Sequence, residues 1–225
     1  MAVGMVVAVE LDSIFDFYGK VEEIESTKGF SVYKTLKGGE DIYIIHSGAG
    51  IAAASAGTQH LISKYNVDTI VNFGVVGGLT ENLKKYKVCI VSSVVHYRYD
   101  ASAFADTIPA QVIGQDSIYI KTDENLFNKA CEIAPELIPA VCCSGDVFVD
   151  LAEDKAKLHK DYGGDICDME SAGIILTCEA NSVPCLMIKA ISDGLMEGAK
   201  EFNLEVNDAG TLALSVMDKV LSCRI

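Results

Sequence analysis

Apolar residues gather in short continuous runs along this chain, and most of the runs are not interrupted by alternating polar residues. Such runs are typical of strands that are covered on both faces of a sheet. We therefore expect a buried sheet built from five strands and a weaker sixth at residues 138–143. The five strands are expected at residues 4–9, 42–46, 68–73, 87–95 and 183–191.

Helical patterns lie between several of these runs. Residues 124–134 carry apolar side chains at helical spacing. Residues 50–65 are mostly small and apolar, with polar residues at intervals. Two further helices are expected at residues 168–181 and 206–222. This alternation of strands and helices predicts an α/β sandwich around a mostly parallel or mixed sheet.

No domain boundary is apparent in the 225 residues, because the chain contains no linker, low-complexity tract or internal repeat. The longest interruption of the periodic pattern spans residues 98–118 and holds a single proline. It indicates an excursion within one domain rather than a linker. We expect a single domain over residues 1–225, a length that can bury one substantial core.

Glycine, serine and acidic residues follow five of the six expected strands. In an open α/β sheet, ligands bind outside the carboxyl ends of the strands, where loops converge and helix N-termini offer free amides. Any one of these loops is explained by ordinary turn chemistry. As a set they predict a ligand site, formed by "ELD" (10–12), "SGAG" (47–50), "GVVGG" (74–78), "SGD" (144–146) and "SDG" (192–194).

Acidic side chains outnumber basic ones by 32 to 18, which gives a formal net charge of −14. Such a surface repels phosphate backbones, so nucleic acid is not an expected partner. No stretch approaches the ~20 apolar residues that span a bilayer, and the apolar "MVVAV" is too short for a signal peptide. We therefore expect a cytoplasmic protein with no membrane partner.

The eight cysteines are expected to be free thiols, most of them buried. The chain has no C-x-x-C pair, and without a secretory signal disulfides are not favoured. Zinc-ligand spacing is absent, and the four histidines lie far apart, so we expect no metal site. A P-loop, a dinucleotide-binding glycine motif and a G-x-S-x-G nucleophile motif are absent as well.

Five segments of the chain resemble, in their order and spacing, the nucleoside phosphorylase and nucleosidase superfamily: "SGAGIAAASAG", "NFGVVGGL", "SGDVFV", "DMESAGI" and "KAISD". The closest resemblance is to the 5'-methylthioadenosine/S-adenosylhomocysteine nucleosidases, and it covers nearly the whole chain. It implies a single α/β/α domain with a central mixed sheet, usually assembled as homodimers or higher homo-oligomers. It also implies hydrolysis of the N-glycosidic bond of a purine nucleoside, without a cofactor.

The resemblance assigns roles to particular residues. Asp193 matches the general acid that protonates N7 of the leaving purine, although an aspartate after a strand could also be a simple turn residue. Glu170 matches the glutamate that accepts hydrogen bonds from the ribose hydroxyls and stabilises positive charge on the sugar. Phe148 matches the aromatic that stacks on the base, and the backbone of Val149 is expected to read the purine edge. The other expected substrate-binding residues are Met169, Ser192, Gly74, Val75, Ala49, Val9 and Phe104.

The sequence departs from the nucleosidase pattern at the residue that activates water. Counting from the first strand, this position falls on Asp12 instead of a glutamate, and Glu10 is a nearby competitor. Where the family has a serine, this chain has Val75. Where the family has an arginine before "AISD", this chain has Lys189, which keeps the positive charge but lacks the planar guanidinium group. The 5' pocket is expected to be lined by Val9, Ala49, Ala101 and Phe104.

Two other functions remain open at this stage. A purine nucleoside phosphorylase would need cations for phosphate, yet "VELDSIF" and "NFGVVGG" contain no lysine or arginine. A non-catalytic nucleoside-binding protein would have no need of Asp193. We therefore expect hydrolysis, with Asp193, Asp12 and Glu170 as the catalytic residues.

Overall fold

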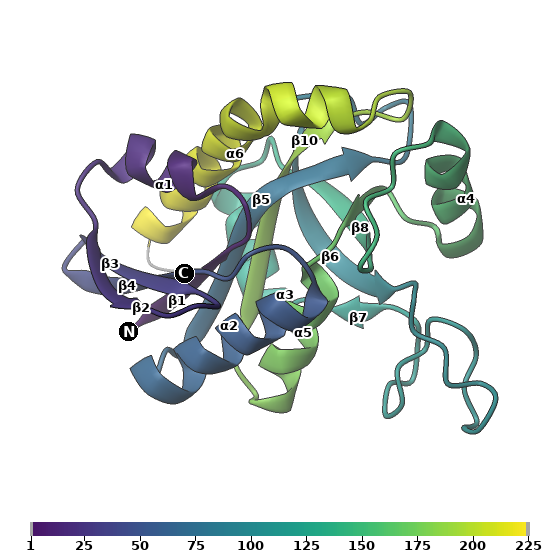
Figure 1. The fold of residues 1–225 in the computed structure, drawn as a ribbon, viewed down its shortest axis with the longest axis horizontal. Helices are drawn as coiled ribbons and strands as arrows, with labels where there is room; N and C mark the ends of the chain where they lie inside the picture. Colours follow the sequence, from purple (N-terminus) through teal and green to yellow (C-terminus); the bar gives the residue numbers. More distant parts are fainter. Residues whose placement is uncertain (1, 224–225) are drawn as a thin grey trace.

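The apolar runs form the centre of one ten-stranded mixed sheet in the computed structural model, which describes residues 2–223 (Figure 1). Helices cover both faces of this sheet, so the expected α/β/α sandwich is confirmed. The helices are α1 (Leu11–Tyr18), α2 (Ile51–Tyr65), α3 (Glu124–Ile133), α4 (Ala152–Tyr162), α5 (Ser171–Ala180) and α6 (Ala199–Ser222).

The strands include all six that the apolar runs predicted. They are β1 (Val3–Val7), β2 (Glu22–Ser26), β3 (Ser31–Lys37), β4 (Glu40–His46), β5 (Thr69–Gly78), β6 (Val88–His96), β7 (Ile120–Lys121), β8 (Ile138–Ser144), β9 (Ile166–Asp168) and β10 (Cys185–Asp193). The order across the sheet is β10-β6-β8-β9-β5-β1-β4-β3-β2, and β7 pairs with β6.

Part of the sheet closes on itself around β5. Strand β10 pairs in parallel with β5 and antiparallel with β6, while the short strand β9 joins β8 to the end of β5. Because β9 runs antiparallel to the last residues of β5, its own last residue, Asp168, follows Cys167, which pairs with Gly77. The carboxyl ends of β1, β9 and β10 therefore meet beside one stretch of β5.

Two strands run further than the sequence predicted. Strand β5 continues through the glycines expected to form a loop, and β10 continues to Asp193 across an irregularity in its register with β5. Gly78 in β5 allows a close approach of the chain, since a Cβ there would lie 2.5 Å from the carbonyl oxygen of Leu83. The sequence pattern also missed α1, β2, β3, β7, α4 and β9, and it placed the start of α6 too late.

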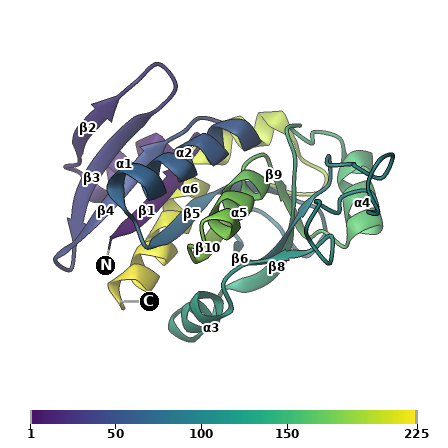
Figure 2. The ribbon, with the colours of Figure 1, turned by 90° about the horizontal axis from the view of Figure 1, so that it is seen from below.

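Apolar side chains form a large core on each face of the sheet and a smaller third cluster that includes Leu158 of α4. Helices α1, α3 and α6 contribute to one core, and α2 and α5 contribute to the other. Strands β2–β4 and helix α4 lie at opposite ends of the molecule in both views (Figures 1 and 2). The excursion at residues 98–118 contains no helix or strand and projects from the body near the α4 end (Figure 1).

Six of the eight cysteines are buried, and none forms a disulfide within residues 2–223. Among residues 2–223, no helix is long and apolar enough to cross a membrane. Within the same residues, no group of three or more histidine, cysteine or acidic side chains is arranged to hold a metal ion.

Candidate active site

A cleft opens beside β5, where the ends of β1, β9 and β10 converge. Its walls include eight residues that the sequence assigned to the site: Val9, Ala49, Val75, Phe148, Val149, Met169, Glu170 and Asp193. The other lining residues are Ala8, Glu10, Val76, Gly77, Val147, Cys167, Asp168 and Phe202.

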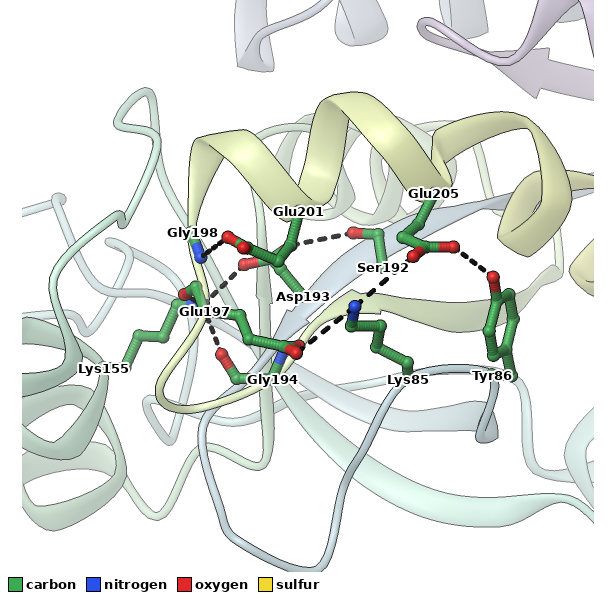
Figure 3. Close-up of polar contacts among 10 residues, drawn as sticks. All are labelled: Lys85, Tyr86, Lys155, Ser192, Asp193, Gly194, Glu197, Gly198, Glu201 and Glu205. Carbon is green, nitrogen blue, oxygen red and sulfur yellow. Dashed lines mark hydrogen bonds and ion pairs between the residues drawn. The ribbon is translucent and has the colours of Figure 1, made fainter.

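Asp193 is the last residue of β10, and its side chain lines the cleft while only 2% of the residue is exposed. Both carboxylate oxygens are engaged. Oδ1 accepts a hydrogen bond from the hydroxyl of Ser192 at 2.8 Å, and Oδ2 lies 2.5 Å from Nζ of Lys155 (Figure 3). Asp193 is therefore a strand residue held in a fixed orientation, not a turn residue. Ser192 was expected to touch substrate, but it lies behind Asp193 and outside the cleft wall.

Glu170 sits at the N-terminal end of α5 and reaches across the cleft floor to the start of α2. Its Oε1 accepts the backbone N–H of Gly50 at 2.9 Å, and Oε2 accepts that of Met169 at 3.2 Å. Burial, and then the negative charge of Asp168, raises the pKa of Glu170 to about 7. The carboxylate is thus an acceptor whose charge is costly because it is buried beside Asp168, and hydroxyl donors or a cation would stabilise that charge.

Asp168 and Lys189 form a buried ion pair below this carboxylate, with 3.0 Å between Nζ and Oδ2. Burial alone would raise the pKa of Asp168, but Lys189 and the hydroxyl of Ser171 hold it below its ordinary value. Conversely, burial alone would lower the pKa of Lys189, and Asp168 raises it. Both groups stay charged, so the pair adds no net charge beneath Glu170. Asp168 was not among the site residues predicted from the sequence, although an acidic residue two positions before Glu170 could have indicated it.

Glu10, not Asp12, lies in the cleft. Glu10 is 3% exposed, and its two oxygens accept the backbone N–H groups of Val75 at 2.8 Å and Val9 at 3.0 Å. Asp12 is exposed on the first turn of α1 and does not line the cleft. The expected register is corrected by two residues, because β1 ends at Val7 and α1 starts at Leu11.

Gly74 does not line the cleft, but it makes the position of Glu10 possible. A Cβ at Gly74 would lie 2.8 Å from Oε1 of Glu10, a distance that real side chains essentially never show. The glycine therefore lets the carboxylate lie against β5 and accept the Val75 N–H. Gly74 therefore lies next to Glu10, outside the wall of the cleft.

Phe148 and Val149 lie on a loop that is anchored to two helix N-termini. Asp146 accepts the backbone N–H of Ile51 in α2, and Asp150 accepts that of Ala199 in α6, both at 2.7 Å. An acidic side chain at a helix N-terminus is favoured by the helix dipole. The anchors hold the segment between them over the cleft. There the Phe148 ring packs edge-to-face on Phe202, with 5.3 Å between ring centroids.

The excursion does not reach the cleft of its own chain. Phe104 was expected in the 5' pocket, but it is 81% exposed on the projecting segment, and the buried Ala101 does not line the cleft either. The sequence pattern could not reveal this, because residues 98–118 have no periodicity that would fix their direction. Of the residues expected in the 5' pocket, Val9 and Ala49 line the cleft.

Comparisons with known proteins agree with this architecture. Aminodeoxyfutalosine nucleosidase of Campylobacter jejuni is 30% identical over 192 residues, which cover 84% of this chain and 81% of that protein. The native structure of futalosine hydrolase of Helicobacter pylori matches with a TM-score of 0.90 and 25% identity, over 98% of this chain and 97% of the other. A variant of H. pylori 5'-methylthioadenosine/S-adenosylhomocysteine nucleosidase, with 5'-methylthioadenosine in its active site, matches with the same TM-score, identity and coverage.

The resemblance carried by the five sequence motifs is therefore confirmed. The model of the phosphorylase superfamily matches residues 2–222, which is nearly the whole chain. The chain belongs to the phosphorylase superfamily.

Proposed function

We propose that this protein is a nucleosidase that uses water to cleave the N-glycosidic bond of an adenine nucleoside with a 5' substituent. The observation that carries the proposal is the placement of three carboxylates, those of Glu10, Glu170 and Asp193, around one mostly apolar cleft. The names of the relatives, which include nucleosidases for aminodeoxyfutalosine and 5'-methylthioadenosine, support the same reaction.

Asp193 acts as the general acid in this proposal. When the bond between C1' and N9 breaks, its electron pair moves to the purine, and a proton at N7 lets the base leave as a neutral molecule. Asp193 lines the cleft from the end of β10, close to the Phe148 loop that would stack on the base. The backbone N–H and carbonyl of Val149 make no hydrogen bond within residues 2–223, so both are available for hydrogen bonds to the edge of the purine.

Glu170 binds the ribose hydroxyls and Glu10 activates the attacking water. As the sugar becomes oxocarbenium-like, an ionised Glu170 stabilises its positive charge more than it stabilised the ground state. Glu10 then accepts the proton of the water that attacks C1'. Glu10 takes the role that the sequence assigned to Asp12, and it has the longer side chain that the resemblance leads one to expect.

Hydrolysis is favoured over phosphorolysis by the charge of the cleft. Its lining side chains include Glu10, Asp168, Glu170 and Asp193, but none of the lysines or arginines of residues 2–223. Nζ of Lys189 is already paired with Asp168, and that of Lys155 with Asp193. A phosphate dianion bound here would face carboxylates without an available cation, which is costly.

The substrate is best identified by direct comparison of candidate nucleosides. We propose 5'-methylthioadenosine, S-adenosylhomocysteine or aminodeoxyfutalosine, since all carry adenine and a 5' substituent. Release of adenine from each would be measured against adenosine and inosine, with and without inorganic phosphate. We expect free adenine and a free reducing sugar, with no acceleration by phosphate. Recovery of a sugar 1-phosphate would overturn the hydrolytic proposal.

We further propose that the protein works as a homodimer or a higher homo-oligomer. The projecting excursion carries exposed apolar side chains, including Phe104, Ile108 and Ile113, of which Phe104 is 81% exposed. A second copy could cover this surface, and the excursion could in turn supply Phe104 to the 5' end of the neighbour's cleft. Sedimentation analysis of the wild type and of Phe104→Ser would test this. A monomeric wild type at micromolar concentration would contradict it.

A further inference from the structure

Lys155 is a fully buried lysine that the proposed reaction does not yet use. It lies on α4, has 0% exposure, and does not line the cleft. Its Nζ contacts three acceptors: Oδ2 of Asp193 at 2.5 Å, the carbonyl oxygen of Gly194 at 2.8 Å, and that of Glu197 at 2.7 Å (Figure 3). Three acceptors match the three N–H donors of an ammonium group, so the buried side chain is charged.

This ion pair raises a question about the general acid. Both oxygens of Asp193 accept hydrogen bonds, one from Ser192 and one from Lys155, as an ionised carboxylate does. A carboxylate has no proton to give to a purine. The proton nearest to it is on the ammonium of Lys155, which is close enough to pass it directly.

The other titratable groups around Lys155 and Asp193 are either neutral or already have hydrogen-bond or ion-pair partners. On β9, burial raises the pKa of the Cys167 thiol, which stays neutral, while Asp168 is paired with Lys189. In the segment before α6, Glu197 accepts the N–H of Gly194 at 2.8 Å and pairs with Lys85 at 3.3 Å. Glu201 of α6 accepts the N–H of Gly198 at 3.3 Å (Figure 3).

We propose that Lys155 acts through Asp193 and supplies the proton that Asp193 delivers to the purine. The step balances. As the C1'–N9 bond breaks, the carboxylate of Asp193 takes a proton from the Lys155 ammonium, leaving an amine, and passes a proton on to N7. Glu10 takes a proton from the attacking water. After the products leave, Glu10 releases its proton to solvent and Lys155 regains one, so the net reaction is nucleoside plus water to free sugar and adenine.

This inference rests on the proposed role of Asp193. It predicts that the damage done by Lys155→Met depends on pH. Without the lysine, Asp193 must take its proton from solvent, which becomes harder as the pH rises. We expect kcat within about threefold of wild type near pH 5.5 and at least about tenfold lower near pH 8.5, a loss typical of impaired general acid catalysis. Expressing each value as a ratio to wild type at the same pH removes the titration of Glu170.

The matched control is Lys157→Met on the same helix, where the side chain is 69% exposed. It should leave kcat unchanged at every pH. If Lys155→Met does not fold, as judged by circular dichroism, Lys155→Gln replaces it, because the amide can still bond Asp193 but has no proton to give. A loss that is equal at all pH values, or no loss, would overturn the inference and leave Lys155 as a clamp on residues 194–197.

A double variant separates this inference from the proposed function. In Asp193→Asn, the addition of Lys155→Met should lower kcat by less than about threefold, because the lysine acts only through the carboxylate. A further loss as large as in the single variant would also overturn the inference. If Asp193→Asn itself keeps wild-type turnover, the proposed general acid fails. If it is inactive while the Lys155→Met loss is independent of pH, only the role of Lys155 fails.

Discussion

Oε1 of Glu10 lies 2.8 Å from the backbone nitrogen of Val75, and this hydrogen bond joins the end of β1 to the middle of β5. It turns the Glu10 side chain into the cleft, whereas Asp12, two residues later on α1, is exposed. The relationship decides which of the two acids lies in the cleft.

The first prediction compares these two acids. Glu10→Ala should lower kcat by about 10²-fold or more, in line with the loss of a general base. Asp12→Ala serves as the matched control and should stay within about twofold, as is usual for a change at an exposed position. Steady-state release of adenine measures both. The reverse result, with Asp12→Ala inactive and Glu10→Ala active, would return the role to Asp12.

The second prediction concerns the general acid. Asp193→Asn keeps the shape and the hydrogen bond from Ser192 but removes the proton donor, so kcat should fall by about 10²- to 10⁴-fold and stay measurable at high enzyme concentration. Nucleoside affinity, measured by calorimetry, should stay within about tenfold of wild type. Turnover within threefold of wild type would mean that Asp193 only orders the end of β10.

The third prediction follows from the pKa of Glu170, which is raised to about 7. An ionised Glu170 is needed at the ribose, so kcat/KM should rise as the pH increases through about 7. Glu170→Gln should lower kcat/KM and remove this rise. A pH profile with the same acid limb in the Gln variant would assign that limb to another group.

The same shift makes a prediction for stability. The folded protein holds a proton on Glu170 more tightly than the unfolded chain, where the ordinary value is 4.5. The resulting stabilisation is fully present below about pH 4.5 and is lost as the pH rises through about 7. Glu170→Gln should therefore gain stability relative to wild type between these values, as measured by urea unfolding at several pH values. A stability difference that does not change with pH would contradict the assignment.

The last prediction tests how closely Glu10 lies against β5. Gly74→Ala would place a methyl group 2.8 Å from Oε1 of Glu10, so the carboxylate must shift from the position in which it accepts the Val75 N–H. We expect kcat to fall by roughly tenfold or more, since displacing a catalytic base by a fraction of an ångström is costly. Gly29→Ala is the control, because a methyl group added there would have no atom within 4 Å. Equal activity of both variants would argue against Glu10 as the base.

Much of the fold could be predicted from the sequence, because a strand buried on both faces is recognisable as a continuous apolar run. A strand covered on two sides must be apolar throughout, and six such runs appear as six strands. The polar residues at their ends marked the site, and Glu170, Phe148 and Asp193 do line one cleft. Short or half-exposed elements such as β9 and α4 were missed, because three residues, or a helix rich in charge, leave little periodic signal.

Tertiary structure alone decided which polar groups face one another. The choice between Glu10 and Asp12 depended on where β1 ends and α1 begins, which local preferences do not fix to within two residues. The ion pair of Lys155 with Asp193 joins residues 38 positions apart, and that of Asp168 with Lys189 joins β9 to β10. A lysine on a charged helix gives no sign in the sequence that it will be buried. Its environment comes from the packing of α4 against the end of β10, and only the folded chain brings these two segments together.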